Sequence, residues 1–199
     1  MPTPPTTPMP TPAITTPNAQ TIDAGRCSLV LVDYQQRLMP AIHDGTAVVA
    51  RALQLGRIAR ALEIPVLGTE QNPRGLGPNV DELRALCDRT LPKMHFDACA
   101  DGLVDALRAT RDPAPTQVVV AGCEAHVCLL QTALGLLRAG LRVWVAADAC
   151  GSRSATHHAL AMQRLQAAGA TLVCVEMAAF EWLHGCEHPR FKAVLPLLK

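Results

Sequence analysis

Apolar and polar residues follow two different periods along most of the chain. Continuous apolar runs with few polar interruptions predict strands that are covered on both faces, as in a parallel sheet. A weaker strand is expected at 90–95, where Leu91 and Met94 flank Pro92 and Lys93. The stronger runs predict five further strands, at 27–32, 64–68, 117–121, 141–147 and 170–175.

Between these runs, apolar residues recur with helical spacing. Gly140 and Gly169 stand just beyond two of the periodic segments, where a glycine commonly ends a helix. Because strands and helices alternate, the sequence predicts an α/β fold with a mainly parallel sheet and right-handed crossovers. The expected helices cover 45–62, 101–109, 125–139 and 154–168, with short helices near 177–184 and 189–198.

Residues 1–24 have a different composition, rich in Pro and Thr. Such a segment buries little apolar surface and resists helix and strand formation, so a disordered tail is expected. A Pro-rich docking segment is the alternative interpretation, although no P-x-x-P with a flanking Arg is present. The predicted folded domain is therefore 25–199.

Composition excludes several classes of protein. The formal net charge is only +1 over 199 residues, and no basic stripe predicts nucleic-acid binding. No apolar run approaches the roughly 18 residues of a membrane span, and no secretory signal is recognisable. Eight cysteines lie at irregular spacings, mostly within apolar runs, which favours free thiols in a reducing, cytoplasmic compartment.

Chemically active side chains follow several of the predicted strands. Asp33, Glu70, Cys128 and Asp148 come after four of them, and Lys93 lies on or beside the weaker strand. Ligands of open parallel sheets bind outside the carboxyl ends of the strands. The sequence therefore predicts a site at this edge, although a single Asp at a strand end is more often a solvated turn residue.

Nucleophilic acyl transfer is the chemistry that these groups could perform. Cys128 falls where a strand turns into a helix, and backbone N–H groups with the helix dipole would favour its thiolate there. Asp33 would accept and return a proton, Lys93 would hold the charges in place, and N–H groups of the 123–128 turn could form an oxyanion hole. The alternatives are a core thiol at Cys128 and a surface lysine at Lys93.

His126 is a second candidate base, because Cys–His pairs are common in thiol hydrolases. It lies only two residues from Cys128, so the two side chains would point apart on a helix. We therefore expect Asp33 to be the base and His126 to be a pocket wall or substrate contact. No histidine has metal-site spacing with a carboxylate, and the turn after Val120 lacks the glycine pattern of a dinucleotide site.

These motifs resemble the isochorismatase-like cysteine hydrolase superfamily. The resemblance covers about 26–199, and the segments 69–77 and 188–192 are similar to the isochorismatase domain-containing subgroup. The matching segments are Leu29-Val30-Leu31-Val32-Asp33-Tyr34-Gln35, Pro92-Lys93, Gly122-Cys123-Glu124-Ala125-His126-Val127-Cys128 and Ala147-Asp148-Ala149-Cys150-Gly151-Ser152-Arg153, followed by Ala168-Gly169-Ala170.

The resemblance implies a catalytic triad of Asp33, Lys93 and Cys128 in a three-layer α-β-α, Rossmann-like fold with strand order 3-2-1-4-5-6. It also implies a non-proline cis peptide between Cys123 and Glu124, which would aim the N–H groups of Glu124 and Cys128 into the oxyanion hole. Members are commonly oligomeric, so a homo-oligomer is expected.

Departures from relatives narrow the expected reaction. The D-x-H metal element of the nicotinamidase branch is absent, so neither a metal nor another cofactor is expected. Cys128 argues against vinyl-ether hydrolysis and leaves cleavage of a C–N amide-type bond in a small molecule. Gln35, Gln71 and Asn72, with His126, are expected to line the substrate pocket.

Two functions of other classes stay open. The chain could be a catalytically weak member that acts as a binding or scaffold protein, since a triad can persist without efficient turnover. It could also respond to oxidants through Cys128 or Cys123.

Overall fold

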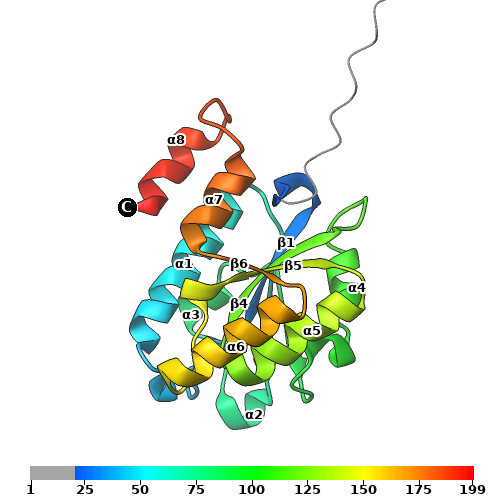
Figure 1. The fold of residues 1–199 in the computed structure, drawn as a ribbon, viewed down its shortest axis with the longest axis vertical. Helices are drawn as coiled ribbons and strands as arrows, with labels where there is room; N and C mark the ends of the chain where they lie inside the picture. The colour runs from blue at the N-terminus through cyan, green and yellow to red at the C-terminus, as the bar shows by residue number, and fades with distance from the viewer. Residues whose placement is uncertain (1–20) are drawn as a thin grey trace, which may run out of the picture.

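The structure is a computed structural model that describes residues 21–199, so most of the predicted tail lies outside the described residues. Its centre is a six-stranded sheet of order β3-β2-β1-β4-β5-β6 in which every neighbouring pair is parallel, as predicted (Figure 1). The strands are β1 (Cys27–Val32), β2 (Val66–Gln71), β3 (Arg89–Lys93), β4 (Gln117–Gly122), β5 (Arg142–Ala146) and β6 (Thr171–Val173).

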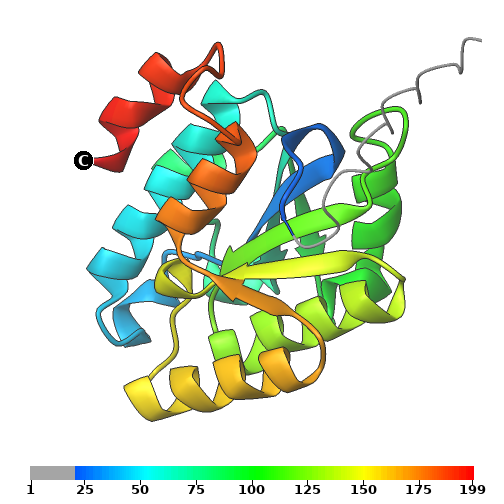
Figure 2. The ribbon, with the colours of Figure 1, turned by 45° about the horizontal axis from the view of Figure 1, so that its top comes forward.

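Helices cover both faces of this sheet, which gives the three-layer arrangement visible in Figure 2. Helices α1 and α7 lie on one face, and α4, α5 and α6 lie on the other (Figures 1 and 2). The helices are α1 (Gly45–Ala61), α2 (Pro73–Leu76), α3 (Asp81–Arg84), α4 (Leu103–Arg108), α5 (Leu130–Arg138), α6 (Ala155–Ala167), α7 (Val175–Leu183) and α8 (Phe191–Val194).

The two central strands explain the continuous apolar runs. All six residues of β1 and all six of β4 are buried, because helices cover both of their faces. The strands pair in register from Cys27 with Gln117 to Val32 with Gly122. Gly122 allows this close approach, since a Cβ there would lie 2.4 Å from the Val32 carbonyl oxygen. The two strands therefore end side by side at one edge of the sheet.

The helical spacing is also reflected in the packing. On α1, Val48, Ala52, Leu55 and Ala59 recur at intervals of three or four residues and are buried against the sheet. A fully buried leucine contributes about 1.5–3 kcal/mol relative to an exposed one. Helix α5 ends before Gly140, which takes the left-handed conformation (φ 82°) expected of a residue that terminates a helix.

The prediction for the second strand was wrong at its C-terminal end. The strand was expected to end at residue 68, but β2 continues through Gln71, and residues 69–71 are all buried. Their polar groups have partners from elsewhere in the chain: the Asn79 side-chain amide donates to the Thr69 carbonyl oxygen, and the Asn79 backbone N–H donates to Glu70 Oε1. Long-range satisfaction of this kind makes a polar strand end stable in the interior.

The boundary of the predicted tail was also placed too late. Ile22 is completely buried, and its N–H donates to the carboxylate of Glu181 on α7 at 2.8 Å. Asp23 caps the short 3-10 turn Ala24–Arg26 through its side chain. The packed domain therefore includes at least Ile22. No helix among the described residues is long and apolar enough to cross a membrane.

Candidate active site

Three side chains from three strand ends meet at the carboxyl edge of the sheet. Asp33 follows β1, Lys93 ends β3, and Cys128 lies in the turn after β4. Asp33 Oδ2 is 2.7 Å from Lys93 Nζ, and the two side chains are 0% and 1% exposed. Cys128 is 5% exposed. The structure thus brings together the three residues predicted to form the triad.

The backbone and neighbouring side chains hold the Asp33 carboxylate in place. Asp33 has φ 55°, an uncommon conformation for a residue with a side chain. Its N–H donates to the carbonyl oxygen of Thr69 at 3.2 Å, and the Thr69 hydroxyl donates to Oδ1 at 2.7 Å. No aligned hydrogen bond from a described residue reaches Oδ2, so its contact with Lys93 is an ion pair rather than a directed hydrogen bond. Oδ2 therefore keeps a lone pair that can accept a proton.

Lys93 is a buried cation surrounded by oxygen atoms. Besides Asp33, Nζ donates to Gln71 Oε1 at 2.7 Å, and longer contacts of 3.4 and 3.5 Å reach the carbonyl oxygens of His95 and Phe96. A buried ammonium group is tolerated only when such partners replace its water. This set of acceptors keeps the charge next to Asp33 and Cys128.

The acidity of Cys128 differs from the expectation. The pKa of the Cys128 thiol is raised to about 12, mainly by burial and next by the Asp33 carboxylate, while Lys93 acts in the lowering direction. At pH 7 a free thiolate with that pKa is disfavoured by about 7 kcal/mol. A helix dipole offers about 0.3–1 kcal/mol, so it cannot reverse the effect of burial. The resting residue is therefore a thiol, and the predicted thiolate preference was wrong.

The turn that carries Cys128 has an unusual backbone. The peptide bond between Cys123 and Glu124 is cis, at the position that the resemblance implies. Ala125–Leu129 then form one π-helical turn before α5, in place of the regular helix expected from residue 125. Single π turns are frequent at functional sites.

Several N–H groups of this turn are already used. Ala125 donates to the Gly151 carbonyl oxygen, whereas Val127 and Leu129 donate to that of Glu124. Those three groups cannot also serve an oxyanion. The Glu124 carboxylate is 2.6 Å from Arg153 Nε, which ties the turn to the segment before α6.

His126 does not contact the thiol. Its Nδ1 lies 3.0 Å from the hydroxyl of Ser152, and its ring stacks on His157 with 4.6 Å between centroids. Burial is the main reason that the pKa of His126 is lowered, and His157 lowers it further. A half-buried, neutral imidazole bonded to Ser152 fits a wall of the site better than a base for Cys128.

The other residues expected in the pocket have different surroundings. Gln35 is completely buried, and its amide makes three hydrogen bonds to the backbone of Gln71 and Gly77. Its amide thus holds the 71–77 segment in place, and a contact of Gln35 with substrate stays a prediction. Asn72 is exposed at the start of that segment, with φ 38°. Gln71 lies inside the cluster, hydrogen-bonded to Lys93.

Thr69 is a site residue that the sequence reasoning missed. It lies just beyond the expected end of the second strand, and its hydroxyl is one of the two side-chain groups that hold Asp33. The available signal was the polar Thr-Glu-Gln sequence directly after an apolar strand.

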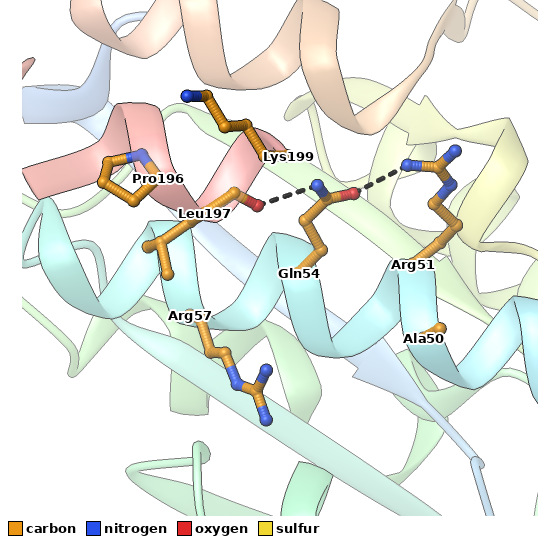
Figure 3. Close-up of a pocket in the computed structure, with 7 residues that line it drawn as sticks. All are labelled: Ala50, Arg51, Gln54, Arg57, Pro196, Leu197 and Lys199. Carbon is orange, nitrogen blue, oxygen red and sulfur yellow. Dashed lines mark hydrogen bonds between the residues drawn. The ribbon is translucent and has the colours of Figure 1, made fainter.

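The predicted triad does not line five of the cavities on the described part of the molecule. These five cavities have volumes of 190 to 520 Å³. Figure 3 shows the cavity of about 380 Å³ between α1 and the C-terminal turn. Its charged side chains, Arg51, Arg57 and Lys199, point away from one another, so they do not converge on a ligand. Among the described residues, no three His, Cys, Asp or Glu side chains are grouped to hold a metal ion.

Fold and site together define a doubly wound α/β protein with an Asp–Lys–Cys cluster at the carboxyl edge of its sheet. The family model described as the isochorismatase domain matches residues 27–177. The chain therefore belongs to the isochorismatase family, a family of hydrolase type.

Individual relatives agree with this assignment. Isochorismatase domain-containing protein 2 of Rattus norvegicus is 38% identical over 173 residues, which cover 86% of this chain and 80% of the relative. Among solved structures, MAR1 ribonuclease from Caenorhabditis elegans is 33% identical with a TM-score of 0.84, covering 89% and 92% of the two chains. The YcaC gene product of Escherichia coli, described as an octameric hydrolase of unknown specificity, is 26% identical with a TM-score of 0.82, covering 92% and 91%.

Proposed function

We propose that this chain is a cysteine hydrolase that cleaves a C–N amide-type bond of a small molecule through a thioester on Cys128. The observation that carries the proposal is the buried contact of 2.7 Å between Asp33 Oδ2 and Lys93 Nζ beside the thiol. An acid–base group, a fixed cation and a nucleophile are the parts that such a reaction needs.

The first step forms the acyl-enzyme. Because the pKa of Cys128 is about 12, its proton has to leave as the sulfur attacks, and Asp33 Oδ2 accepts it. The Cys128 sulfur bonds to the amide carbon while the C=O π electrons move to oxygen. N–H groups of Glu124 and Cys128 stabilise this oxyanion. Asp33 then gives its proton to the leaving nitrogen, the C–N bond breaks, and a thioester remains.

The second step regenerates the enzyme. Asp33 takes a proton from water as the water oxygen attacks the thioester carbon. The C–S bond breaks, a carboxylic acid product forms, and Asp33 returns the proton to the Cys128 sulfur. Lys93 stays charged throughout and stabilises negative charge on Asp33 or on the sulfur in turn.

Two exposed or half-buried side chains supply substrate contacts in this account. Asn72 is the exposed residue that follows Gln71, and His126 offers the ring nitrogen that Ser152 does not use. Both are neutral hydrogen-bonding groups, which suits a small uncharged amide.

A substrate panel with matched cysteine variants tests the function. Small amides, carbamates and nicotinamide-like compounds are assayed with the parent protein, Cys128→Ala and Cys186→Ala, since Cys186 is an exposed cysteine away from the cluster. The expected result is turnover by the parent and by Cys186→Ala but not by Cys128→Ala. Normal turnover by Cys128→Ala would sink the mechanism. Single-stranded RNA belongs in the panel as well, because the Caenorhabditis elegans relative is described as a ribonuclease.

The closed surroundings of the cluster favour a second candidate, a binding or scaffold protein with weak catalysis. Asp33, Lys93 and Cys128 are each no more than 5% exposed, and none of the five cavities reaches them. A panel without any turnover, together with a stable partner recovered by the parent and by Cys128→Ala alike, would favour this candidate over the hydrolase.

We further propose a homo-oligomer in the cytoplasm. The Escherichia coli relative is described as octameric. Two large apolar side chains that follow Lys93 are also exposed, Met94 to 67% and Phe96 to 50%. Eight free cysteines fit a reducing compartment. Light scattering after size-exclusion chromatography gives the mass, and a monomer at micromolar concentration would contradict the assembly.

A further inference from the structure

Gln71 joins two members of the cluster through one atom. Its Oε1 accepts a hydrogen bond from Lys93 Nζ at 2.7 Å and a longer one from Cys128 Sγ at 3.9 Å. A single amide oxygen therefore contacts both the cation and the nucleophile.

The orientation of this amide is determined by its surroundings. Its Nε2 donates to the carbonyl oxygen of Met94 at 2.9 Å, so the oxygen is the end that faces Lys93. A flipped amide would place an NH₂ group against the ammonium, where donor would meet donor.

The backbone of Gln71 is held as firmly as its side chain. Gln35 receives a hydrogen bond from the Gln71 N–H at 2.8 Å and donates to the Gln71 carbonyl oxygen at 2.9 Å. Gln71 also pairs in register with Lys93 across β2 and β3, which places the two side chains on the same face of the sheet. Because both neighbours are strand residues, the contact between Gln71 and Lys93 is part of the rigid scaffold.

These contacts leave little of Gln71 for a substrate. The residue is 8% exposed, its oxygen serves two donors, and its nitrogen is engaged by Met94. The expected role as a pocket contact does not explain an amide whose oxygen faces away from solvent toward Lys93 and Cys128.

We propose that Gln71 is a positioning residue that orients the Lys93 ammonium and holds the Cys128 thiol proton until a substrate turns that proton toward Asp33. This inference rests on the proposed function and extends it by one residue. An acceptor for S–H stabilises the thiol form, and occupying Lys93 Nζ withholds part of its charge from the sulfur. Gln71 therefore keeps the nucleophile protonated at rest.

Alkylation of Cys128 tests this role without any substrate. The second-order rate with iodoacetamide is measured at pH 8, and peptide mass spectrometry assigns the label to Cys128 among the eight cysteines. Gln71→Met removes the acceptor and should speed alkylation about tenfold, the effect of lowering the thiol pKa by about one unit. Gln71→Glu adds a carboxylate of the same shape and should slow it by a similar factor.

The matched controls are Gln36→Met and Gln36→Glu, because the Gln36 side chain is exposed and donates one long hydrogen bond, of 3.4 Å, to Asp81. Both controls should alkylate within about twofold of the parent protein. Changes of the same sign in both Gln71 variants, or no change in either, would overturn the proposal and leave Gln71 a merely structural residue.

Different results would contradict the proposed hydrolase function and the positioning role of Gln71. If Cys128→Ala still turns over an amide, the proposed function is wrong, while opposite shifts in the two Gln71 variants still support the positioning role. If Gln71→Met does not fold, the isosteric Gln71→Glu alone decides, because unchanged or faster alkylation in that variant contradicts the proposal.

Discussion

Asp33 and Lys93 form an ion pair at 2.7 Å in which neither side chain is more than 1% exposed. The two residues are 60 positions apart in the chain and come from strands separated in the sheet by β2. Breaking a buried pair costs about 3–5 kcal/mol, since the remaining charge lacks both water and partner. Each of the two buried charges therefore depends on the other for its stability.

Removing Lys93 should reveal this dependence directly. Lys93→Met is expected to lower the free energy of unfolding by about 3–5 kcal/mol, because the Asp33 carboxylate is left unpaired. Chemical denaturation measures the loss. The exposed pair of Arg108 and Asp105, 3.5 Å apart, is the control, and Arg108→Met should cost less than about 1 kcal/mol.

The double variant Asp33→Asn, Lys93→Met checks the cause. It should be more stable than Lys93→Met alone, because neither buried charge remains. Equal losses in the single and double variants would show that packing, not charge, explains the effect.

Asp33→Asn should raise the alkylation rate of Cys128 and lower the turnover of amides. The Asp33 carboxylate raises the pKa of Cys128, so its removal lowers that pKa and speeds alkylation by iodoacetamide at pH 8 about tenfold per unit. Amide turnover should fall below detection because the base is gone. Slower alkylation in Asp33→Asn would contradict the assigned electrostatics.

The parent protein should show a steep pH dependence of alkylation. With a pKa of about 12, the thiolate fraction of Cys128 rises about tenfold for each pH unit between 7 and 10. A plateau near pH 8 in the rate of Cys128 labelling would show that the thiol is acidic and that burial does not dominate.

Thr69 should stabilise the fold through its hydrogen bond to the Asp33 carboxylate. Thr69→Val keeps the shape but removes the 2.7 Å hydrogen bond to Oδ1, and a buried acceptor without a partner costs about 1–3 kcal/mol. Thr69→Ser retains the hydroxyl and should recover most of that stability. Denaturation midpoints of the two variants, with turnover as a second measurement, separate the hydroxyl from the methyl group.

At Gly122, the last residue of β4, Val32 of the neighbouring strand β1 leaves no space for a side chain. A Cβ there would lie 2.4 Å from the Val32 carbonyl oxygen and 2.5 Å from the Val32 Cβ. Gly122→Ala should therefore lower stability by about 1–3 kcal/mol through overpacking. Gly185→Ala is the control, because no atom lies within 4 Å of its added Cβ. Similar melting temperatures for the two variants would contradict the close approach.

The mainly parallel sheet could be predicted because continuous apolar runs indicate strands buried on both faces, whereas its strand order came from the family resemblance. The end of β2 could not be predicted in the same way. Residues 69–71 are polar, and what buries them is a set of partners supplied by Gln35, Asn79 and Lys93. Such partners are distant in sequence, so composition alone favours a loop.

The candidate site also combines features that could be predicted from the sequence with features that could not. The strand ends indicated Asp33, Lys93 and Cys128, because side chains after parallel strands share one edge. The high pKa of Cys128 could not be predicted, since it depends on how deeply the turn is buried. The role of Gln35 depends on which backbone atoms its amide meets, and no sequence pattern reports those contacts.

The central claim is that Cys128 carries the acyl group during turnover. The most direct measurement is intact-protein mass spectrometry after acid quench of the parent protein with the amide that it cleaves fastest in the panel. The account predicts a mass increase equal to the acyl group, located on the peptide that contains Cys128 and absent from Cys128→Ala. Turnover by Cys128→Ala at the parent's rate, or an acyl group located on another residue, would contradict it.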